Sequence, residues 1–515
     1  MDAPRILSAK PDNESTNMLD NKIILEFDEY VALKNANQEL IVSPPLKYPV
    51  EFKMKNKKLQ ISWRDTLLEN TTYLFQFGKG IADVNENNVL DSNIFVFSTG
   101  PYLDSFEVSG KVIDDFDLKP LEEVWVMLYD ADIDSLPLTE LPRYFSKTDA
   151  SGNFYLKYLR PGNYKIFALS GKNGGYLYDA PGEGIAFLEG MISATNPSDS
   201  IAKDTAYALK LFVEEDSIQY VKSFVQVGNT GLIVEFNRAV EGMVISELTG
   251  IEDVKSWTES WSLDHDSVTY WFEKPNEYDS LKLRVEIGDF SDTIFFRKPS
   301  GKMGRAKGGK GGNESKGLTL SSSGARQLHY KPMRMVSKTP LASMDKPEEF
   351  VFIEDKDTID VAPYIKKEFY ALVLDYPWKQ SSKYKLIIPD SLVADRFGVQ
   401  NDSLIFSFVA SRKEDFGQLY FSHSLPELGH KFIWQLMKGD DVVDERIVEA
   451  KGKVKYEYLP TGSYRVRLLY DANDNGQWDT GYYKGKRQPE IVKYFHEAID
   501  VRSNWATEIE WNLKK

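Results

Sequence analysis

The sequence contains no cysteine among its 515 residues. This absence excludes disulfide bridges, thiolate metal sites and cysteine nucleophiles. No run of 18 apolar residues occurs, so no segment is predicted to cross a membrane as a helix. Only five histidines are present, and they are scattered along the chain without a metal-binding spacing.

Basic residues are in the minority. The chain has 63 Lys and Arg residues against 78 Asp and Glu residues, which gives a formal net charge of −15. An acidic surface repels phosphate backbones, so nucleic acid is not an expected partner. No G-x-S-x-G nucleophile motif occurs, and "GRAKGGKG" from Gly304 lacks the Ser or Thr of a phosphate-binding loop. We predict that the protein is not an enzyme and requires no cofactor.

Aromatic residues, in contrast, are abundant, with 28 Tyr, 29 Phe and 10 Trp. They occur in short runs that alternate with polar residues and are separated by turn residues, as in "GNFYLKYLRPGNYKIFAL" from Gly152. This pattern favours short strands, whereas helical periodicity is scarce. Because the chain is too long for one core, we predict an all-β protein, a string of five β-sandwich domains.

Internal repeats support this organisation. The stretch 158–181 aligns with 458–481 without a gap at an offset of 300, with Tyr164 matching Tyr464. A second pair, "TTYLFQFGKGIADVNENN" from Thr71 and "SKYKLIIPDSLVADRFGVQND" from Ser382, has an offset of 311 or 312. A third pair is "IILEFDEYV" at Ile23 and "LIVEFNRAV" at Leu232. Repeats of this size predict a series of domains rather than a solenoid.

The predicted boundaries follow from these repeats. One type of module is expected at 1–103, 213–300 and 318–412, and a second type at 104–212 and 413–515. Residues 301–317 are rich in Gly and Lys and are predicted to be a flexible linker. A basic segment of this kind is usually a solvated loop, although it also suits lipid headgroups or an acidic partner.

Two resemblances refine the module types. "PRILSAKPDN", "IILEFDEYV" and "FVFSTG" in the first module resemble the SbsA-type bacterial Ig-like domain. "VSGKVID" at Val108 and "KTDASGNFYLKYLRPGNYKIFAL" at Lys147 resemble the carboxypeptidase regulatory-like, or prealbumin-like, domain. The second copy of that domain keeps Gly452 but loses the Asp of the signature. The resemblances imply three Ig-like domains and two carboxypeptidase regulatory-like domains.

The order of these modules is similar to that of Ig-like-domain lipoproteins of Bacteroidota. That resemblance implies an outer-membrane protein, exposed at the cell surface and held by an N-terminal lipid anchor. The signal peptide and lipid-modified cysteine of that family are missing from this sequence, which we therefore interpret as a mature fragment. The expected partner is an outer-membrane barrel or a multi-protein envelope complex, bound by a non-catalytic scaffold through its sandwich edges and loops.

One stretch of the last module resembles the start of a calcium-binding loop. In "DANDNGQWD" the side chains of Asp471, Asn473 and Asn475 occupy ligand positions 1, 3 and 5, Gln477 can offer its carbonyl, and Asp479 falls at position 9. Position 12 is Tyr482, so the bidentate glutamate of such loops is missing. The alternative is a turn in which Asp and Asn bond their own backbone. Calcium thus remains an optional ligand in this prediction.

Aromatic clusters leave a second function open. Trp257 and Trp261 in "SWTESW" would share one face of a strand and could stack on a sugar. The same residues, like Tyr482 and Tyr483, also fit packing in a sandwich core or at its edge. A surface glycan-binding or adhesive protein is therefore the alternative to the scaffold.

Overall fold

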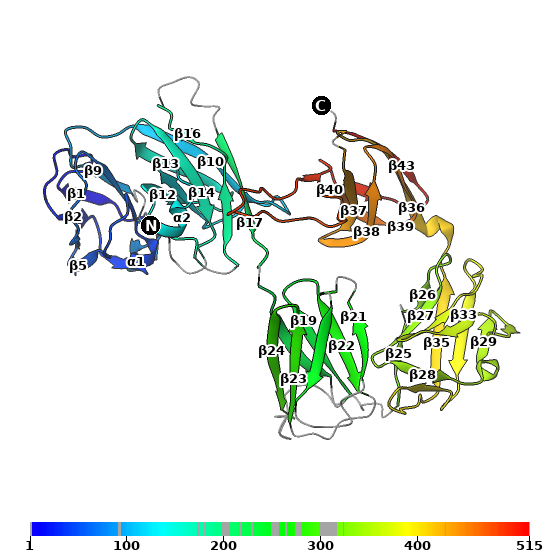
Figure 1. Ribbon diagram of the computed structural model, residues 1–515. Helices are drawn as coiled ribbons and strands as arrows, with labels where there is room; N and C mark the ends of the chain where they lie inside the picture. Colours follow the sequence, from blue (N-terminus) through cyan, green and yellow to red (C-terminus); the bar gives the residue numbers. More distant parts are fainter. Residues whose placement is uncertain are drawn as a thin grey trace.

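The computed structural model describes residues 3–513 except 91–93, 172–175, 180–181, 198–205, 217, 228–229, 241, 249–256, 263–264, 273–279, 298–316, 323 and 428. Almost all regular structure in this part of the chain is β-strand, arranged as successive β-sandwiches (Figure 1). The predicted all-β fold class is confirmed. We keep the predicted segments as the first to fifth modules; their exact boundaries stay a prediction. Residues 301–316 of the predicted linker lie outside the described residues.

The first module pairs its strands in the orders β1-β2-β6-β5, β4-β7-β9 and β3-β8. Its core includes the fully buried Phe27, Phe75 and Phe97; burial alternates along β2, whereas β7 and β9 are buried along almost their whole length. Its elements are β1 (Ile6–Lys10), β2 (Lys22–Phe27), β3 (Val31–Leu33), α1 (Ala36–Glu39), β4 (Ile41–Ser43), β5 (Glu51–Lys55), β6 (Lys58–Ser62), β7 (Thr72–Gln76), β8 (Ile81–Asp83) and β9 (Ile94–Ser98).

The second module follows the order β12-β11-β14-β15-β17-β10-β13, with β16 beside β14. Strands β10 and β17 are parallel, and the other pairs are antiparallel. Its elements are β10 (Phe106–Asp114), β11 (Trp125–Tyr129), α2 (Leu136–Thr139), β12 (Tyr144–Lys147), β13 (Asn153–Leu159), β14 (Asn163–Leu169), β15 (Gly184–Phe187), β16 (Ile192–Ser193) and β17 (Ala206–Val213).

The fifth module repeats most of this topology, but among the described residues it forms two sheets, because β41 and β43 are not paired as β15 and β17 are. Its sheets have the orders β39-β36-β43, with β36 and β43 parallel, and β38-β37-β40-β41, with β42 beside β40. Its strands are β36 (Phe416–Ser424), β37 (Lys431–Lys438), β38 (Asp441–Val448), β39 (Lys451–Pro460), β40 (Gly462–Asp471), β41 (Val492–Tyr494), β42 (Ile499–Val501) and β43 (Ala506–Asn512). Each strand thus corresponds to one in the second module, from β10 and β36 to β17 and β43.

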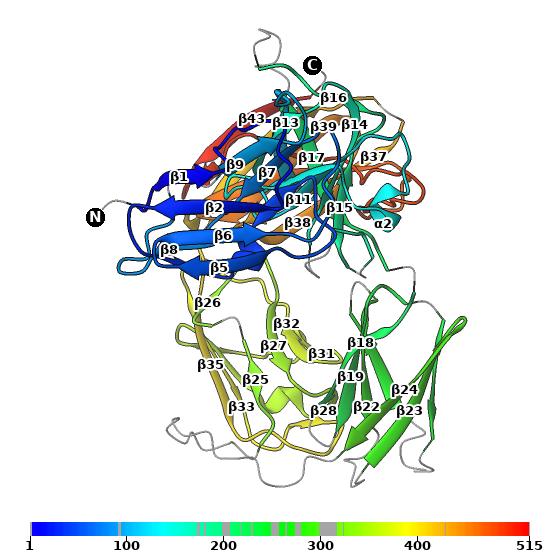
Figure 2. The same cartoon turned by 90° about the vertical axis from the view of Figure 1, so that its left-hand side faces the viewer.

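The third and fourth modules lie side by side below the other three (Figure 2). The third has the sheets β18-β19-β22-β21 and β20-β23-β24, and the largest sheet of the fourth has the order β26-β35-β33-β29-β30. Elements of the third are β18 (Val221–Val227), β19 (Gly231–Phe236), β20 (Met243–Glu247), β21 (Trp257–Trp261), β22 (Ser267–Phe272), β23 (Ser280–Ile287) and β24 (Phe290–Arg297). Those of the fourth are β25 (Leu320–Ser321), β26 (Arg326–Gln327), β27 (Met333–Ser337), β28 (Leu341–Met344), η3 (Pro347–Glu349), β29 (Val351–Glu354), β30 (Asp357–Ile359), β31 (Ile365–Lys367), β32 (Ala371–Leu374), β33 (Lys383–Ile388), β34 (Val393–Asp395) and β35 (Leu404–Ala410), and η4 (Lys413–Asp415) leads into the fifth module.

The repeated sequences make repeated contacts. The hydroxyl of Tyr164 donates to the carbonyl of Arg160 at 2.8 Å, and that of Tyr464 donates to the carbonyl of Pro460 at 2.7 Å. In the other module type, the Tyr73 hydroxyl accepts a backbone N–H five residues upstream, and the Tyr384 hydroxyl does the same. These aligned residues therefore have the same structural role in each copy.

The modules form two arms. Arg160 of the second module donates to the carbonyls of Glu69 and Asn70, which fixes the first module against the second. In the other arm, Trp271 of the third module packs against Tyr370 of the fourth, with 6.1 Å between ring centroids. The fourth and fifth modules meet where Tyr330 stacks on Tyr458 at 4.6 Å. After β17 the chain leaves the first arm through Glu214, Glu215 and Asp216.

Candidate functional site

One loop of the fifth module connects the two arms through several contacts with the second module. Residues 472–491 connect β40 to β41, and the loop reaches across to β17 of the second module (Figure 1). We call this loop the clasp. Its counterpart in the second module, residues 170–183 between β14 and β15, is shorter. The clasp begins directly after Asp471, so the predicted calcium ligands lie at its base.

At the base of the clasp, the predicted calcium ligands bond to one another and to the loop backbone. Asp471 is only 1% exposed, and its carboxylate accepts the backbone N–H groups of Asn475 and Gly476, both at 2.9 Å. Asp479 accepts the side-chain amides of Asn473 at 2.7 Å and Asn475 at 2.9 Å. This is the Asp- and Asn-rich turn that the sequence offered as the alternative to a metal site.

Two further residues complete the base. The side-chain oxygen of Asn475 accepts the backbone N–H of Gln477 at 2.8 Å, so the predicted ligands do come together in space. Glu490 was missed from the sequence, although it accepts the backbone N–H of Ala472 at 2.7 Å and of Asp479 at 3.0 Å. Burial raises the pKa of Glu490. Its place was not predictable because it lies beyond the expected ligand spacing.

Calcium binding stays a prediction. Within the described part of the chain, no group of three or more His, Asp or Glu residues is placed to hold a metal ion. Both oxygens of Asp471 already accept backbone hydrogen bonds, so a calcium ion would have to share them with the turn.

Replacing Asp471 with alanine tests the two interpretations of the turn. We expect Asp471→Ala to lower the free energy of unfolding of the fifth module by about 1–3 kcal/mol, because the turn loses two hydrogen bonds to a buried carboxylate. Thermal melting with calcium or with a chelator would measure it, with the exposed Asp500→Ala as control. If calcium also binds, it raises the melting temperature of the unsubstituted protein and the substitution removes that rise. No rise in the unsubstituted protein would contradict the calcium prediction.

The tip of the clasp inserts one tyrosine into the second module. Tyr483 is 5% exposed and belongs to an aromatic cluster on the outer face of β11, β14 and β15. Its ring lies 5.5 Å from Phe187, 5.7 Å from Tyr178 and 6.0 Å from Phe167, with edge-on geometry in each case. Such edge-to-face pairs are favourable beyond the burial of their area. Burial raises the pKa of the Tyr483 hydroxyl, which stays protonated as a donor.

Polar contacts surround this ring. The Tyr483 hydroxyl donates to the backbone carbonyl of Asp134, and its backbone N–H donates to the Glu214 carboxylate. Lys486 forms an ion pair with the Asp134 carboxylate. Hydrogen bonds from Lys486 and Lys165 hold the pKa of Asp134 below its usual value. The carboxylate is thus ionised when the clasp is closed, which keeps the charge pair intact.

Two more hydrogen bonds fix the sides of the tip. The Thr480 hydroxyl donates to the carbonyl of Val213 at 2.7 Å, and the Gln488 side chain donates to the carbonyl of Phe187 at 3.0 Å. Gly481 lies so close to Phe212 that a Cβ atom would be 2.5 Å from its ring. A side chain at this position would therefore displace the tip.

The second module also reaches into the fifth. Phe116 lies 4.7 Å from the Trp478 ring, and the Arg467 guanidinium lies 4.1 Å from the Phe116 centroid. Arg467 is held by a 2.6 Å hydrogen bond to Gln435. Trp478 and Tyr178 occupy aligned positions of the two repeats, and both lie in this interface. The two copies of the duplicated module are therefore packed against each other.

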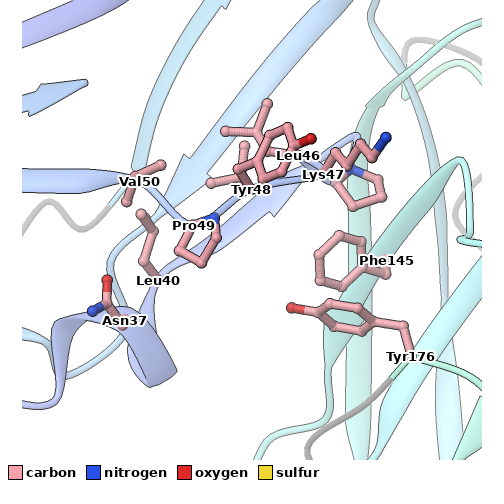
Figure 3. Close-up of a pocket in the computed structure, with 11 residues that line it drawn as sticks. Asn37, Leu40, Leu46, Lys47, Tyr48, Pro49, Val50, Phe145 and Tyr176 are labelled. Atoms are coloured by element: carbon pink, nitrogen blue, oxygen red, sulfur yellow. The ribbon is translucent and has the colours of Figure 1, made fainter. Parts of the chain in front are cut away.

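A pocket lies between the first and second modules (Figure 3). Its volume is about 260 Å³. Phe145 and Tyr176 form one wall, 4.7 Å apart, and the half-exposed Tyr48 lies on the opposite side. The lining residues are Asn37, Leu40, Val42, Pro45, Leu46, Lys47, Tyr48, Pro49, Val50, Phe145 and Tyr176.

The predicted sugar-stacking tryptophans face inward instead. Trp257 and Trp261 are half-buried and pack against the core of the third module. Trp257 lies 5.1 Å from Tyr270, and Trp261 stacks on Phe236 at 6.5 Å. Their packing agrees with the core interpretation rather than with an exposed platform.

No helix in the described residues has the length and apolar character that crossing a membrane requires.

Comparisons with known proteins give one family match, which covers the first module. No curated protein matches the chain. Among solved structures, domains 1–6 of the surface layer protein SbsC are 12% identical, with 97% of this chain and 67% of that chain covered and a TM-score of 0.14. BcpA, the major pilin subunit of Bacillus cereus, is 11% identical, with 79% and 99% covered and a TM-score of 0.14. Residues 1–99 match the bacterial Ig-like domain family, as the resemblance of the first module implied.

Proposed function

We propose that this protein is a non-catalytic scaffold, held in the outer membrane by an N-terminal lipid anchor and exposed at the cell surface. It would dock on an outer-membrane barrel or a multi-protein envelope complex. The observation that carries the proposal is the clasp, because it joins the second module to the fifth and closes five modules into one framework. A framework with fixed surfaces can hold a partner in one orientation, which a flexible string of domains cannot do.

The exposed strand edges and loops of the sandwiches supply docking surfaces. On the edge strand β38, for example, Val442, Val443 and Ile447 are between 43% and 58% exposed. Exposed apolar residues on an edge strand favour contact with another protein. These residues support the proposed scaffold function, and they form a surface that a partner would cover.

Co-purification tests this function. The full-length lipidated protein would be extracted from native membranes in mild detergent and recovered by affinity tag, and its partners would be identified. We expect a stoichiometric membrane barrel or envelope subunit to be retained. A matched chain with Ile447→Lys tests the edge of β38, and Ile405→Lys, at a position of similar exposure on the inner strand β35, is its control. Recovery of the protein alone would contradict the scaffold.

The pocket of Figure 3 favours a second function, the binding of a surface glycan. Its exposed Tyr48 and the wall of Phe145 and Tyr176 are the kind of aromatic surface on which sugar rings stack. Trp125 lies 5.1 Å from Tyr176 and would report binding by its fluorescence. If the protein is recovered alone and a glycan changes this fluorescence in a Tyr48-dependent manner, the second function replaces the first.

A further inference from the structure

We propose that the face of the second module beneath the clasp also binds the clasp of a second copy of this chain, so that the protein forms a clasp-exchanged dimer. This interaction goes beyond the scaffold function and does not depend on it. The partner is a second copy because the segment seated on this face belongs to the chain itself. Any other copy carries the same segment with the same complementary chemistry.

The donor side of the contact is compact. The interactions that hold the tip come from Thr480, Tyr483, Lys486 and Gln488, which all lie on one loop. None of these residues belongs to the hydrophobic core of the fifth module. The tip can therefore leave one acceptor face and enter another while its own module stays folded.

The acceptor side is incomplete without a tyrosine from the clasp. Phe167, Tyr178 and Phe187 surround the Tyr483 ring, and the carbonyl of Asp134 accepts its hydroxyl. Removal of the tip would expose these apolar rings to water, which is unfavourable. An acceptor face that loses its own clasp is thus expected to take up another one.

The two arms can separate without breaking a module. Within each arm the modules are held by side-chain contacts, such as Arg160 with Asn70 and Tyr330 with Tyr458. Between the arms the chain passes through Glu214, Glu215 and Asp216, three consecutive acids that lie outside any strand. Domain motions usually need changes at only a few such residues between elements. Release of the clasp, together with the contact of Phe116 with Trp478 and Arg467, would let the arms rotate about this segment.

Concentration decides between the closed monomer and the exchanged dimer. Within one chain, the clasp competes at an effective concentration that is typically in the millimolar range for short connections and falls as the connection lengthens. Here the donor and the acceptor are separated by the third and fourth modules, and Thr480 contacts a residue 267 positions away. A high protein concentration therefore favours exchange more strongly than it would if a short connection joined the clasp to its own acceptor face.

The absence of cysteine allows a direct test in the full-length chain. One chain would carry Lys484→Cys on the clasp, and a second, longer-tagged chain would carry Glu189→Cys on the acceptor face; both positions are exposed. The two chains would be partly unfolded, refolded together over a range of concentrations and treated with a short bismaleimide. A product that contains one of each chain forms efficiently when the clasp of one chain lies on the acceptor face of the other, and the Tyr483→Ser variant below measures how much of it comes from random collision. We expect its yield to rise with concentration.

Matched variants make the result specific. Adding Tyr483→Ser to the clasp chain is expected to reduce the mixed product about tenfold or more, because a buried tyrosine anchor is lost. Tyr482→Ser changes the neighbouring residue, which is 48% exposed, and should leave the yield unchanged. A third chain that carries both cysteines shows whether the two positions lie close enough for the bismaleimide to join them. The proposal is overturned if that chain cross-links within itself while no mixed product forms at the highest concentration, or if both serine variants behave alike.

Discussion

Tyr483→Ser is expected to open the closed arrangement of the five modules. The substitution removes a ring that is 5% exposed and a hydroxyl that donates to the Asp134 carbonyl. Loss of the packing and of this hydrogen bond should weaken the clasp by about 2–4 kcal/mol. Because the clasp binds Val213 and Glu214, where the second module continues into the connection between the arms, a local loss of this size is expected to change the shape of the whole molecule.

Spin labels can measure this change in shape. Labels at Tyr155→Cys in the second module and Ile447→Cys in the fifth would occupy exposed strand positions in a chain that otherwise has no cysteine. The closed protein should give one narrow distance distribution, and Tyr483→Ser should give a broad one at longer distances. Tyr482→Ser is the control, since its side chain is 48% exposed. A narrow distribution that survives Tyr483→Ser would show that other contacts hold the arms together.

The acidity of Asp134 gives the clasp a pH dependence. Its pKa lies below the ordinary value of 3.8 in the closed form because Lys486 and Lys165 donate to it. The contribution of this carboxylate is therefore complete above about pH 4 and is lost as the pH falls through its lowered pKa. The same labelled pair should thus stay closed near neutral pH. Acid should loosen the clasp by protonating Asp134. The lysines are protonated throughout this pH range and do not contribute to the change.

The repeats show how much of the fold can be predicted from the sequence. Alternating runs and turn residues are sufficient for the fold class, because strand periodicity is a local property. The offset of 300 pairs Tyr164 with Tyr464, and both make the same hydrogen bond in the structure. The Asp- and Asn-rich turn at Asp471 was likewise predictable, since its bonds connect neighbours in the chain. Hydrogen bonds between residues that are close in sequence can thus be predicted without a structure.

The clasp could not be predicted, and the reason is geometric. The sequence placed Tyr482 and Tyr483 together as packing residues, yet one is exposed and the other fills an aromatic cluster of a different module. That difference depends on how the arms are oriented, which no local pattern encodes. Trp271 is a similar case, because its partners Tyr370 and Phe397 lie in the next module. The signal that was available is the loop length, which is greater than in the aligned copy.

Trp434→Ala is expected to have the largest effect on stability. Trp434 is fully buried in the fifth module, and its ring lies 5.0 Å from Phe421 and 5.5 Å from Trp511. Removal of a buried tryptophan typically costs about 3–5 kcal/mol because a cavity remains. For a domain of this size the melting temperature of the module should fall on the order of 10–20 °C. Trp505→Ala is the control, since that side chain is 64% exposed.

The melting of the other modules shows what the clasp does for the whole chain. Each module has its own buried cluster, so cores that act independently would leave the remaining transitions unchanged in Trp434→Ala. The clasp, however, starts from β40 of the weakened module and covers apolar rings of the second. We therefore expect the second module also to melt earlier, by a smaller amount, in calorimetry. If Tyr483→Ser lowers that same transition and adds nothing in the Trp434→Ala chain, the coupling passes through the clasp. If neither substitution changed the melting of the second module, the clasp would fix the positions of the modules without stabilising them.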